Sequence, residues 1–344
     1  MKVIGDEYMK KIMFFRSLFY IGGTEKAILN LLKKLKGFEF YIGYTDDSSD
    51  KETLDEFSKY AKVVNIKKEK IEKMDVVVAC SLHYHLIKEF SDVKTDKIIL
   101  WLHHLINFSN SAIMDENEYN KIDKIVVVSK TISNKLESML PKVKDKLITV
   151  YNVIDSLEII KKSLEPINLN LSKQLNLVTV SRVCEAKGFQ RMLILSKALK
   201  KADVKFKWFI IGDNYYQDES KQIKERFSEF KDNFEWLGFL SNPHNIVKQC
   251  DYSVLLSDEE TWGLVLTEAM ILGVPCIVSD FEVAYEQVKD KENGIILSKE
   301  NTESYEDRVI DIINNKDKYK KAVNDFEYRN EVIIEQWESL LYEK

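Results

Sequence analysis

The fold of this chain is decided by residues 257–270, which read SDEETWGLVLTEAM. The short apolar run of residues 252–256 before them predicts a buried strand. The apolar pattern of residues 264–272 predicts a helix, which Gly273 and Pro275 end. The apolar residues 276–278 then predict a second strand. The stretch is therefore predicted to be the strand–loop–helix–strand crossover of a parallel sheet.

Two glutamates stand on either side of the predicted helix start, Glu260 in the loop and Glu268 inside the helix. In open parallel sheets, ligands bind beyond the carboxyl ends of the strands and against the amino ends of the following helices. The backbone amides of Trp262, Gly263 and Leu264 would be donors at that point, where the helix dipole favours an anion. This arrangement fits a ligand with phosphate and several hydroxyls, such as a nucleotide sugar. The ordinary alternative is a chance pair, since Glu near a helix start is a common match to the dipole.

The composition indicates a two-domain globular protein. The chain has 344 residues, of which 45% are apolar and 31% charged, with a net charge of -5. We expect no nucleic-acid partner from this charge. The four cysteines are scattered in apolar runs, which predicts buried thiols rather than disulfides. No targeting segment and no apolar run of roughly 20 residues is visible, so we expect a cytoplasmic protein.

Strand and helix patterns alternate along both halves of the chain, and this predicts an α/β fold class. Uninterrupted apolar runs such as residues 76–78 are typical of a parallel sheet that is covered on both faces. Residues 156–175 are polar and contain Pro166, which favours an interdomain linker. We therefore predict two doubly wound, Rossmann-like domains that face each other across a cleft. Their predicted bounds are 1–157 and 158–327, with a C-terminal helix within 328–344 that packs back.

Two cations follow the first predicted strand of the second domain. Arg182 and Lys187 leave the carboxyl end of this strand, where both could reach a diphosphate and stabilise its charge. The ordinary alternative is two solvated surface cations. Gly212 ends the next strand and would permit a tight turn beside a ligand, or simply a turn. Neither half carries a Gly-x-Gly-x-x-Gly after its first strand, and no P-loop is present, which argues against a nicotinamide dehydrogenase and a P-loop ATPase.

Four histidines lie at or just beyond predicted strand ends of the first domain: His83, His85, His103 and His104. A zinc site needs three or four converging ligands, and no cysteine or carboxylate cluster stands near these residues in the sequence. We therefore expect no metal site. His103 is favoured as a residue of the cleft, with His104 as the alternative if the strand register differs by one residue.

The chain resembles the retaining glycosyltransferases of family 4, which have the GT-B fold. The pieces that carry the resemblance cover most of the chain and occur in the family order: Gly22-Gly23-Thr24-Glu25, Leu102-His103, Val128-Ser129, residues 151–155, Ser181-Arg182, Lys187-Gly188, residues 211–213, Glu260 to Glu268 and Asn293-Gly294. The combination of the Arg/Lys pair with the two spaced glutamates is the most specific part. The chain departs from the family pattern at Asn214 and in residues 281–284, where the family often has glycines.

The resemblance implies a role for each matching residue of the second domain. Glu260 would bind hydroxyls of the donor sugar, and Glu268 would bind the ribose hydroxyls. Arg182 and Lys187 would hold the diphosphate, together with backbone amides near Gly263.

In the first domain, the resemblance implies that Gly22 and Gly23 let a loop close over the phosphates. His103 would lie near the sugar and the acceptor hydroxyl. Enzymes of this family need no metal and no cofactor besides the donor, so none is expected here.

The function that we predict is transfer of a hexose from a nucleotide sugar, expected to be UDP-linked, to a hydroxyl acceptor with retention. The resemblance implies an acceptor in bacterial surface polysaccharide or glycolipid synthesis, either a glycan or a lipid-linked sugar. The lysines of residues 33–36 and 67–70 could touch the inner face of an anionic membrane, or could simply be solvated. The alternatives that remain at this point are a sugar-nucleotide epimerase or a phosphorylase with the same GT-B plan of two domains, and a non-catalytic transferase-like partner subunit.

Overall fold

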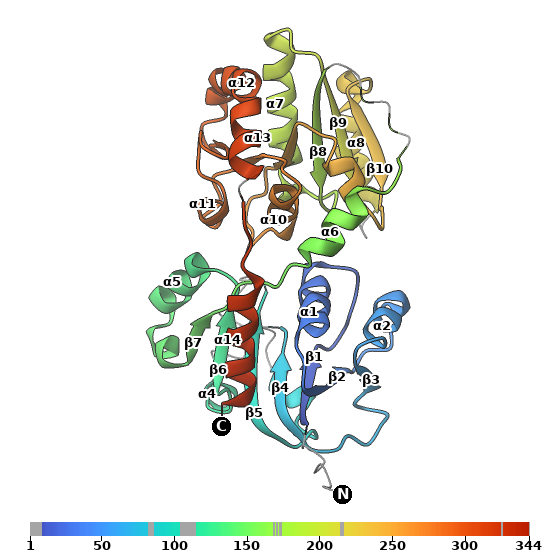
Figure 1. Ribbon diagram of the computed structural model, residues 1–344, viewed down its shortest axis with the longest axis vertical. Coiled ribbons are helices and arrows are strands. Elements are labelled where there is room, and N and C mark those ends of the chain that lie inside the picture. The colour runs from blue at the N-terminus through green and yellow to red at the C-terminus, as the bar shows by residue number, and fades with distance from the viewer. Residues whose placement is uncertain are drawn as a thin grey trace, which may run out of the picture. The chain divides into compact units, whose positions relative to one another are not determined.

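The computed structural model describes residues 9–81, 86–103, 115–167, 169, 171, 174–213, 217–324 and 326–343 (Figure 1). The chain divides into two compact units. The first comprises Met1–Ile154 and Arg329–Lys344, and the second comprises Asp155–Tyr328. The predicted bounds were 1–157 and 158–327, so the structure assigns a few residues near each boundary differently.

Parallel strands form the sheet of the first unit, in the order β3-β2-β1-β4-β5-β6-β7. The strands in that order are β3 Lys62–Asn65, β2 Phe38–Tyr44, β1 Lys10–Phe15, β4 Met74–Ala79, β5 Thr95–Leu102, β6 Lys124–Val127 and β7 Leu147–Thr149. The helices of this unit are α1 Gly23–Lys34, α2 Lys51–Phe57, α3 Leu86–Glu89, α4 Glu116–Tyr119, α5 Lys130–Met139, the 3₁₀ helix η2 Pro141–Lys146 and α14 Asn330–Tyr342. The central strands are buried on both faces, as their uninterrupted apolar runs predict.

The C-terminal helix α14 packs within the first unit (Figure 1). The indole of Trp337 lies edge-on to Trp101 of β5, with ring centroids 4.7 Å apart. The Lys97 ammonium donates to the backbone oxygen of Leu340 at 2.9 Å. The cation therefore satisfies a carbonyl in the last turn of the helix, where the dipole favours positive charge.

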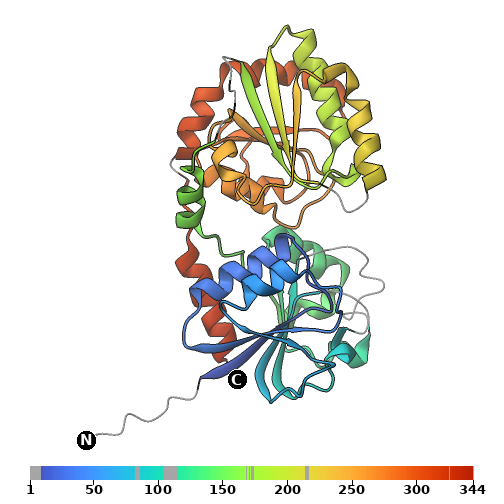
Figure 2. The same ribbon diagram turned by 90° about the vertical axis from the view of Figure 1, so that its right-hand side faces the viewer.

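The second unit has a parallel sheet in the order β10-β9-β8-β11-β12-β13. The strands in that order are β10 Phe234–Gly238, β9 Phe206–Ile211, β8 Leu175–Val180, β11 Tyr252–Leu255, β12 Cys276–Ser279 and β13 Gly294–Leu297. The helices are α6 Ser156–Ser163, η3 Glu185–Lys187, α7 Phe189–Lys201, α8 Gln217–Arg226, η4 Ser228–Phe230, α9 His244–Val247, α10 Leu264–Ile271, α11 Ala284–Gln287, η5 Thr302–Ser304, α12 Tyr305–Asn314 and α13 Lys316–Asn324. Figure 2 shows helices on both sides of this sheet. The predicted α/β class with two Rossmann-like units is confirmed.

The prediction that residues 156–175 form a linker is wrong for their first part, which forms α6. The Asp155 carboxylate caps this helix by accepting from the Glu158 amide at 3.3 Å. Ile159 is buried on the inner side of the helix. The linker prediction rested on polar composition alone and missed the helix cap and the buried Ile159.

Among the residues that the structure describes, no helix is both long and apolar enough to cross a lipid bilayer.

Candidate functional site

The predicted site residues of the second unit follow three neighbouring strands. Arg182 comes after β8, Gly212 directly after β9, and Glu260 in the loop after β11. The sheet order places β9, β8 and β11 side by side, and all three are parallel. The three loops therefore meet at the carboxyl edge of the sheet, where ligands of this fold class bind.

An ion pair joins two of the predicted residues. The Lys187 Nζ lies 2.7 Å from Glu260 Oε1, although the two residues are 73 positions apart. The Ser257 hydroxyl donates to the same carboxylate oxygen at 2.7 Å. The Ser279 hydroxyl in turn donates to the Ser257 carbonyl at 2.6 Å. The side chains of Lys187 and Glu260 are only 18% and 15% exposed, so the pair is better shielded from solvent than a surface salt bridge.

Arg182 differs from Lys187 in its surroundings. Its side chain is exposed, and no residue in the described part of the chain forms an ion pair with it. The neighbouring Cys184 is buried, and this burial raises the pKa of its thiol. Arg182 thus places a solvated cation at the same strand end as the half-buried Lys187.

Glycines at this edge serve backbone packing. Gly188 precedes α7 with φ +73°, and a Cβ there would lie 1.7 Å from the Leu256 carbonyl oxygen. Gly212 has φ +129°, and its Cβ would lie 2.0 Å from the Ser181 carbonyl oxygen. Both positions require glycine because of conformation and contact with backbone. The structure therefore explains why glycine is required at position 212 without reference to a ligand.

The amino end of α10 follows the predicted pattern. Gly263 has φ +80° and is the residue before the helix, which begins at Leu264. The Trp262 side chain is buried, and its indole Nε1 donates to the Thr267 hydroxyl at 3.0 Å. Trp262 was predicted to contribute its backbone amide only. The indole hydrogen bond shows that the Trp262 side chain also holds the loop against the first turns of the helix.

Gln287 of α11 belongs to the same cluster, and the sequence reasoning missed it. Its amide nitrogen donates to the Trp262 carbonyl, and its Oε1 accepts from the Thr267 hydroxyl at 2.7 Å. The side chain is nearly buried. The sequence around it offers no distinctive signal, because Gln287 stands in a mixed segment with Glu286 before it and Lys289 after it. We name Trp262, Thr267 and Gln287 the loop-anchor cluster.

Glu268 lies in the middle of α10 and is buried, with only 4% of its surface exposed. Its Oε2 lies 3.1 Å from His244 Nε2 of α9. His244 is equally buried and was not among the predicted site residues. The sequence signal was available, because His244 is the one histidine of the chain outside the first half.

In the first unit, Gly22 precedes α1 in an extended conformation, and Gly23 is the first residue of this helix. A Cβ on Gly22 would lie 2.8 Å from the Glu25 Oε2. Glu25 is buried and forms an ion pair with the equally buried Arg16. Burial raises the pKa of Glu25, and the Arg16 charge opposes this shift. The small size of Gly22 therefore accommodates this buried carboxylate.

His103 directly follows β5 and is buried against Trp101, with ring centroids 4.3 Å apart. His83, His85, His104 and Asn214 lie outside the described residues. Among the residues that are described, no group of three or more His, Cys, Asp or Glu could hold a metal ion. The roles that the sequence assigned to His103 and to the other site residues stay predictions.

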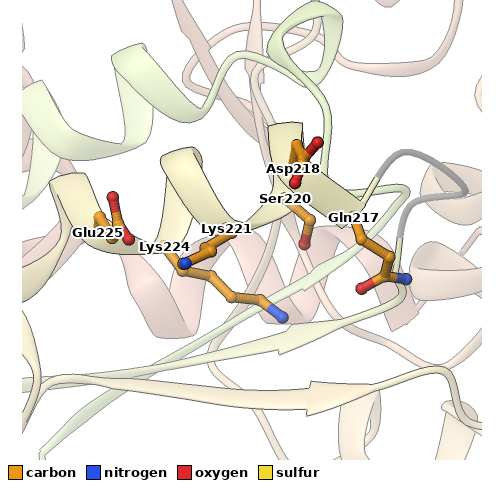
Figure 3. A pocket seen from close by; sticks show the side chains of 6 residues that line it. All are labelled: Gln217, Asp218, Ser220, Lys221, Lys224 and Glu225. Carbon is orange, nitrogen blue, oxygen red and sulfur yellow. The ribbon is translucent and has the colours of Figure 1, made fainter.

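A cavity of about 550 Å³ lies along α8, and none of the predicted site residues lines it (Figure 3). Six side chains of this single helix line it: Gln217, Asp218, Ser220, Lys221, Lys224 and Glu225. Two lysines and two carboxylates balance its charge, and most of these side chains are exposed. It has neither the converging polar groups nor the apolar walls of a typical small-molecule site.

The fold and the site define an α/β protein with two parallel-sheet units and a polar cluster at the carboxyl edge of the second sheet. Residues 160–327, nearly the whole second unit, match the family model of glycosyl transferases group 1. An uncharacterized glycosyltransferase of Methanocaldococcus jannaschii is 26% identical over 323 residues, which cover 87% of this chain and 86% of that protein.

Solved structures show the same fold over nearly the full length. The Anabaena protein HepE, in complex with UDP and glucose, has a TM-score of 0.76 at 16% identity and covers 98% of this chain and 100% of its own. The lipopolysaccharide outer core galactosyltransferase WaaB has a TM-score of 0.64 at 17% identity, with 97% and 99% coverage. The chain has the GT-B fold, and the findings together support a glycosyltransferase.

Proposed function

We propose that the chain is a retaining hexosyltransferase of family 4 that uses a UDP-sugar donor. The observation that carries this proposal is the Lys187–Glu260 pair at the carboxyl edge of the second sheet. In this pair, a cation that would bind phosphate lies next to a carboxylate that would bind sugar hydroxyls. Both lie within the segment that matches the group 1 family model.

The donor would be bound in three parts. Arg182 and Lys187 would hold the diphosphate, helped by the amides around Gly263 at the amino end of α10. Glu260 would bind sugar hydroxyls, and Glu268 would bind the ribose. The choice of UDP is supported by HepE, which was crystallised with UDP and glucose. No metal and no further cofactor is proposed.

The reaction would proceed on one face of the sugar. The bond between the anomeric carbon and the diphosphate oxygen breaks, and a bond from the same carbon to the acceptor oxygen forms. The leaving diphosphate takes the acceptor proton, so no side chain need act as the base. Catalysis would then rest on positioning and on charge stabilisation by Arg182 and Lys187. Gly22 and Gly23 would let their loop close over the phosphates, and His103 would lie near the sugar and the acceptor hydroxyl.

The acceptor that we propose is a glycan or lipid-linked sugar of a surface polysaccharide or glycolipid. WaaB, a lipopolysaccharide galactosyltransferase with the same fold, supports this choice. The exposed lysines of residues 67–70 would add peripheral contact with the cytoplasmic face of an anionic membrane. Sedimentation with anionic lipid vesicles at physiological salt tests this contact, and absence of co-sedimentation would remove it.

The test of the proposed function compares Arg182→Ala and Lys187→Ala with the native protein. UDP-glucose, UDP-galactose and UDP-N-acetylglucosamine serve as donors, and octyl glycosides serve as acceptor probes. Loss of one charge-stabilising donor costs about 2–4 kcal/mol, so kcat/KM should fall roughly 30- to 900-fold in each variant. Lys221→Ala, which removes an exposed lysine of α8, is the matched control and should leave kcat/KM unchanged.

Near-normal turnover in both alanine variants would show that the phosphate assignment is wrong. Conversion of the donor sugar without any acceptor would favour the epimerase alternative. An inverted anomeric configuration in the product, measured by NMR coupling constants, would contradict the retaining mechanism.

A further inference from the structure

His244 and Glu268 form a buried pair at one end of the proposed donor site. The side chains are 5% and 6% exposed, and His244 Nε2 lies 3.1 Å from Glu268 Oε2. The other ring nitrogen of His244, Nδ1, is also buried and has no hydrogen-bond partner among the described residues. A proton on Nδ1 would therefore be buried without an acceptor, which is costly. The geometry favours the tautomer in which Nε2–H donates to the carboxylate.

The backbone of His244 is held in place by its own neighbours. The His244 amide donates to the Asn242 Oδ1 at 3.1 Å. The Asn242 side-chain amide donates to the Lys162 carbonyl at 2.9 Å and to the Glu165 carboxylate at 2.7 Å. These bonds tie the loop before α9 to α6. They hold the backbone of His244 in place, so its imidazole has a defined position next to Glu268.

We propose that His244 is a positioning residue for Glu268 and sets the preference for ribose over 2′-deoxyribose in the nucleotide. This rests on the proposed function, in which Glu268 binds the ribose hydroxyls. A glutamate side chain has three rotatable bonds, and a hydrogen bond to one oxygen restricts them before the ligand arrives. A site that is built to bind a hydroxyl discriminates strongly against the analogue that lacks it. Without His244, the carboxylate would lose this restraint on its orientation.

The alternative is a purely structural role, in which His244 only satisfies a buried carboxylate. The two roles differ in one measurable quantity, the ratio of affinities for a nucleoside diphosphate and its 2′-deoxy form. A structural defect weakens both ligands alike. A positioning defect weakens the ribonucleotide selectively, because only that ligand carries the 2′-hydroxyl.

The experiment measures binding of UDP, ADP and GDP and of their 2′-deoxy forms by calorimetry. The native protein is compared with Glu268→Ala, His244→Leu and His244→Gln, and with Gln249→Leu as a control on an exposed side chain of the same segment. We expect a roughly 10- to 100-fold preference for one ribonucleotide over its deoxy form in the native protein and the control. The preference should fall to that of Glu268→Ala in His244→Leu. It should be largely restored in His244→Gln, whose amide can also donate.

A fifth variant, the double substitution Glu268→Ala with His244→Gln, keeps the test decisive should His244→Leu not fold. Its ratio should equal that of Glu268→Ala alone if His244 acts only through Glu268. An unchanged ratio in a folded His244 variant would overturn the positioning role. Equal affinity for both forms in the native protein would overturn the ribose role while leaving the transferase proposal intact. No binding of any nucleoside diphosphate would overturn the proposed function and this proposal together.

Discussion

Replacement of Gln287 by leucine should destabilise the second unit and weaken nucleotide binding together. In the loop-anchor cluster, the Trp262 indole donates to the Thr267 hydroxyl, which donates to Gln287, which donates back to the Trp262 carbonyl. The three bonds form a closed ring around the loop before α10. Leucine has a similar volume but removes two of the three bonds.

The magnitude follows from these two bonds. A typical hydrogen bond contributes about 0.5–1.5 kcal/mol, and loss of a partner at a buried group costs about 1–3 kcal/mol. Gln287 is nearly buried, so two losses predict a decrease of about 2–4 kcal/mol in the free energy of unfolding. For a unit of this size, such a decrease lowers the melting temperature by about 4–16 °C.

Thermal unfolding and urea titration measure this change, and hydrogen exchange shows where it occurs. Gln190→Leu on α7 is the matched control, because Gln190 is exposed and the same substitution there should change stability by under about 0.5 kcal/mol. Exchange should increase around residues 262–268, and affinity for the nucleoside diphosphate should fall. Equal stability of the two variants would refute the reasoning, since the cluster would then contribute nothing measurable.

Two further predictions concern backbone and charge. Gly188→Ala should destabilise the protein far more than Gly238→Ala in urea titrations. Both glycines have positive φ, but only a Cβ on Gly188 would meet a backbone oxygen, at 1.7 Å. Equal losses of stability in the two variants would contradict this prediction. For Glu25, the raised pKa means that the folded state binds more protons than the unfolded state just above pH 4.5, so stability falls as pH rises through that window. Urea titrations at several pH values measure how much more stable the native protein is than Glu25→Gln, and this difference in the free energy of unfolding should decrease as the pH rises. A constant or increasing difference would contradict the raised pKa of Glu25.

Local apolar patterns predicted the crossover that contains the site. The strand expected at residues 252–256 is β11, Tyr252–Leu255, and the helix expected at residues 264–272 is α10, Leu264–Ile271. These elements depend on the spacing of neighbouring residues and on glycine and proline at their ends. Such information is contained in a short window of sequence, which is why the fold class could be predicted.

The contacts inside the site could not be predicted in this way. Lys187 and Glu260 are 73 residues apart, and His244 and Glu268 are 24 apart. Each pair forms only because the sheet order brings different loops and helices together. Gly22 is part of the stretch that carries the family resemblance, yet the nearby Glu25 side chain is enough to explain why a small residue stands there. The sequence indicated candidate site residues, but not which of their side chains form hydrogen bonds or ion pairs with one another.

The Lys187–Glu260 pair gives the two cations of the site unequal roles in the proposed reaction. An ammonium group has three donors, so Lys187 can keep its bond to Glu260 and still donate to a phosphate oxygen. Because Ser257 also holds Glu260, the cation and the carboxylate are placed before the donor arrives, and little reorganisation is needed as charge develops. Arg182 is exposed and forms no such pair in the described part of the chain, so its side chain must be ordered by the ligand itself. Lys187 therefore links the phosphate and sugar parts of the proposed site, whereas Arg182 serves the phosphate alone.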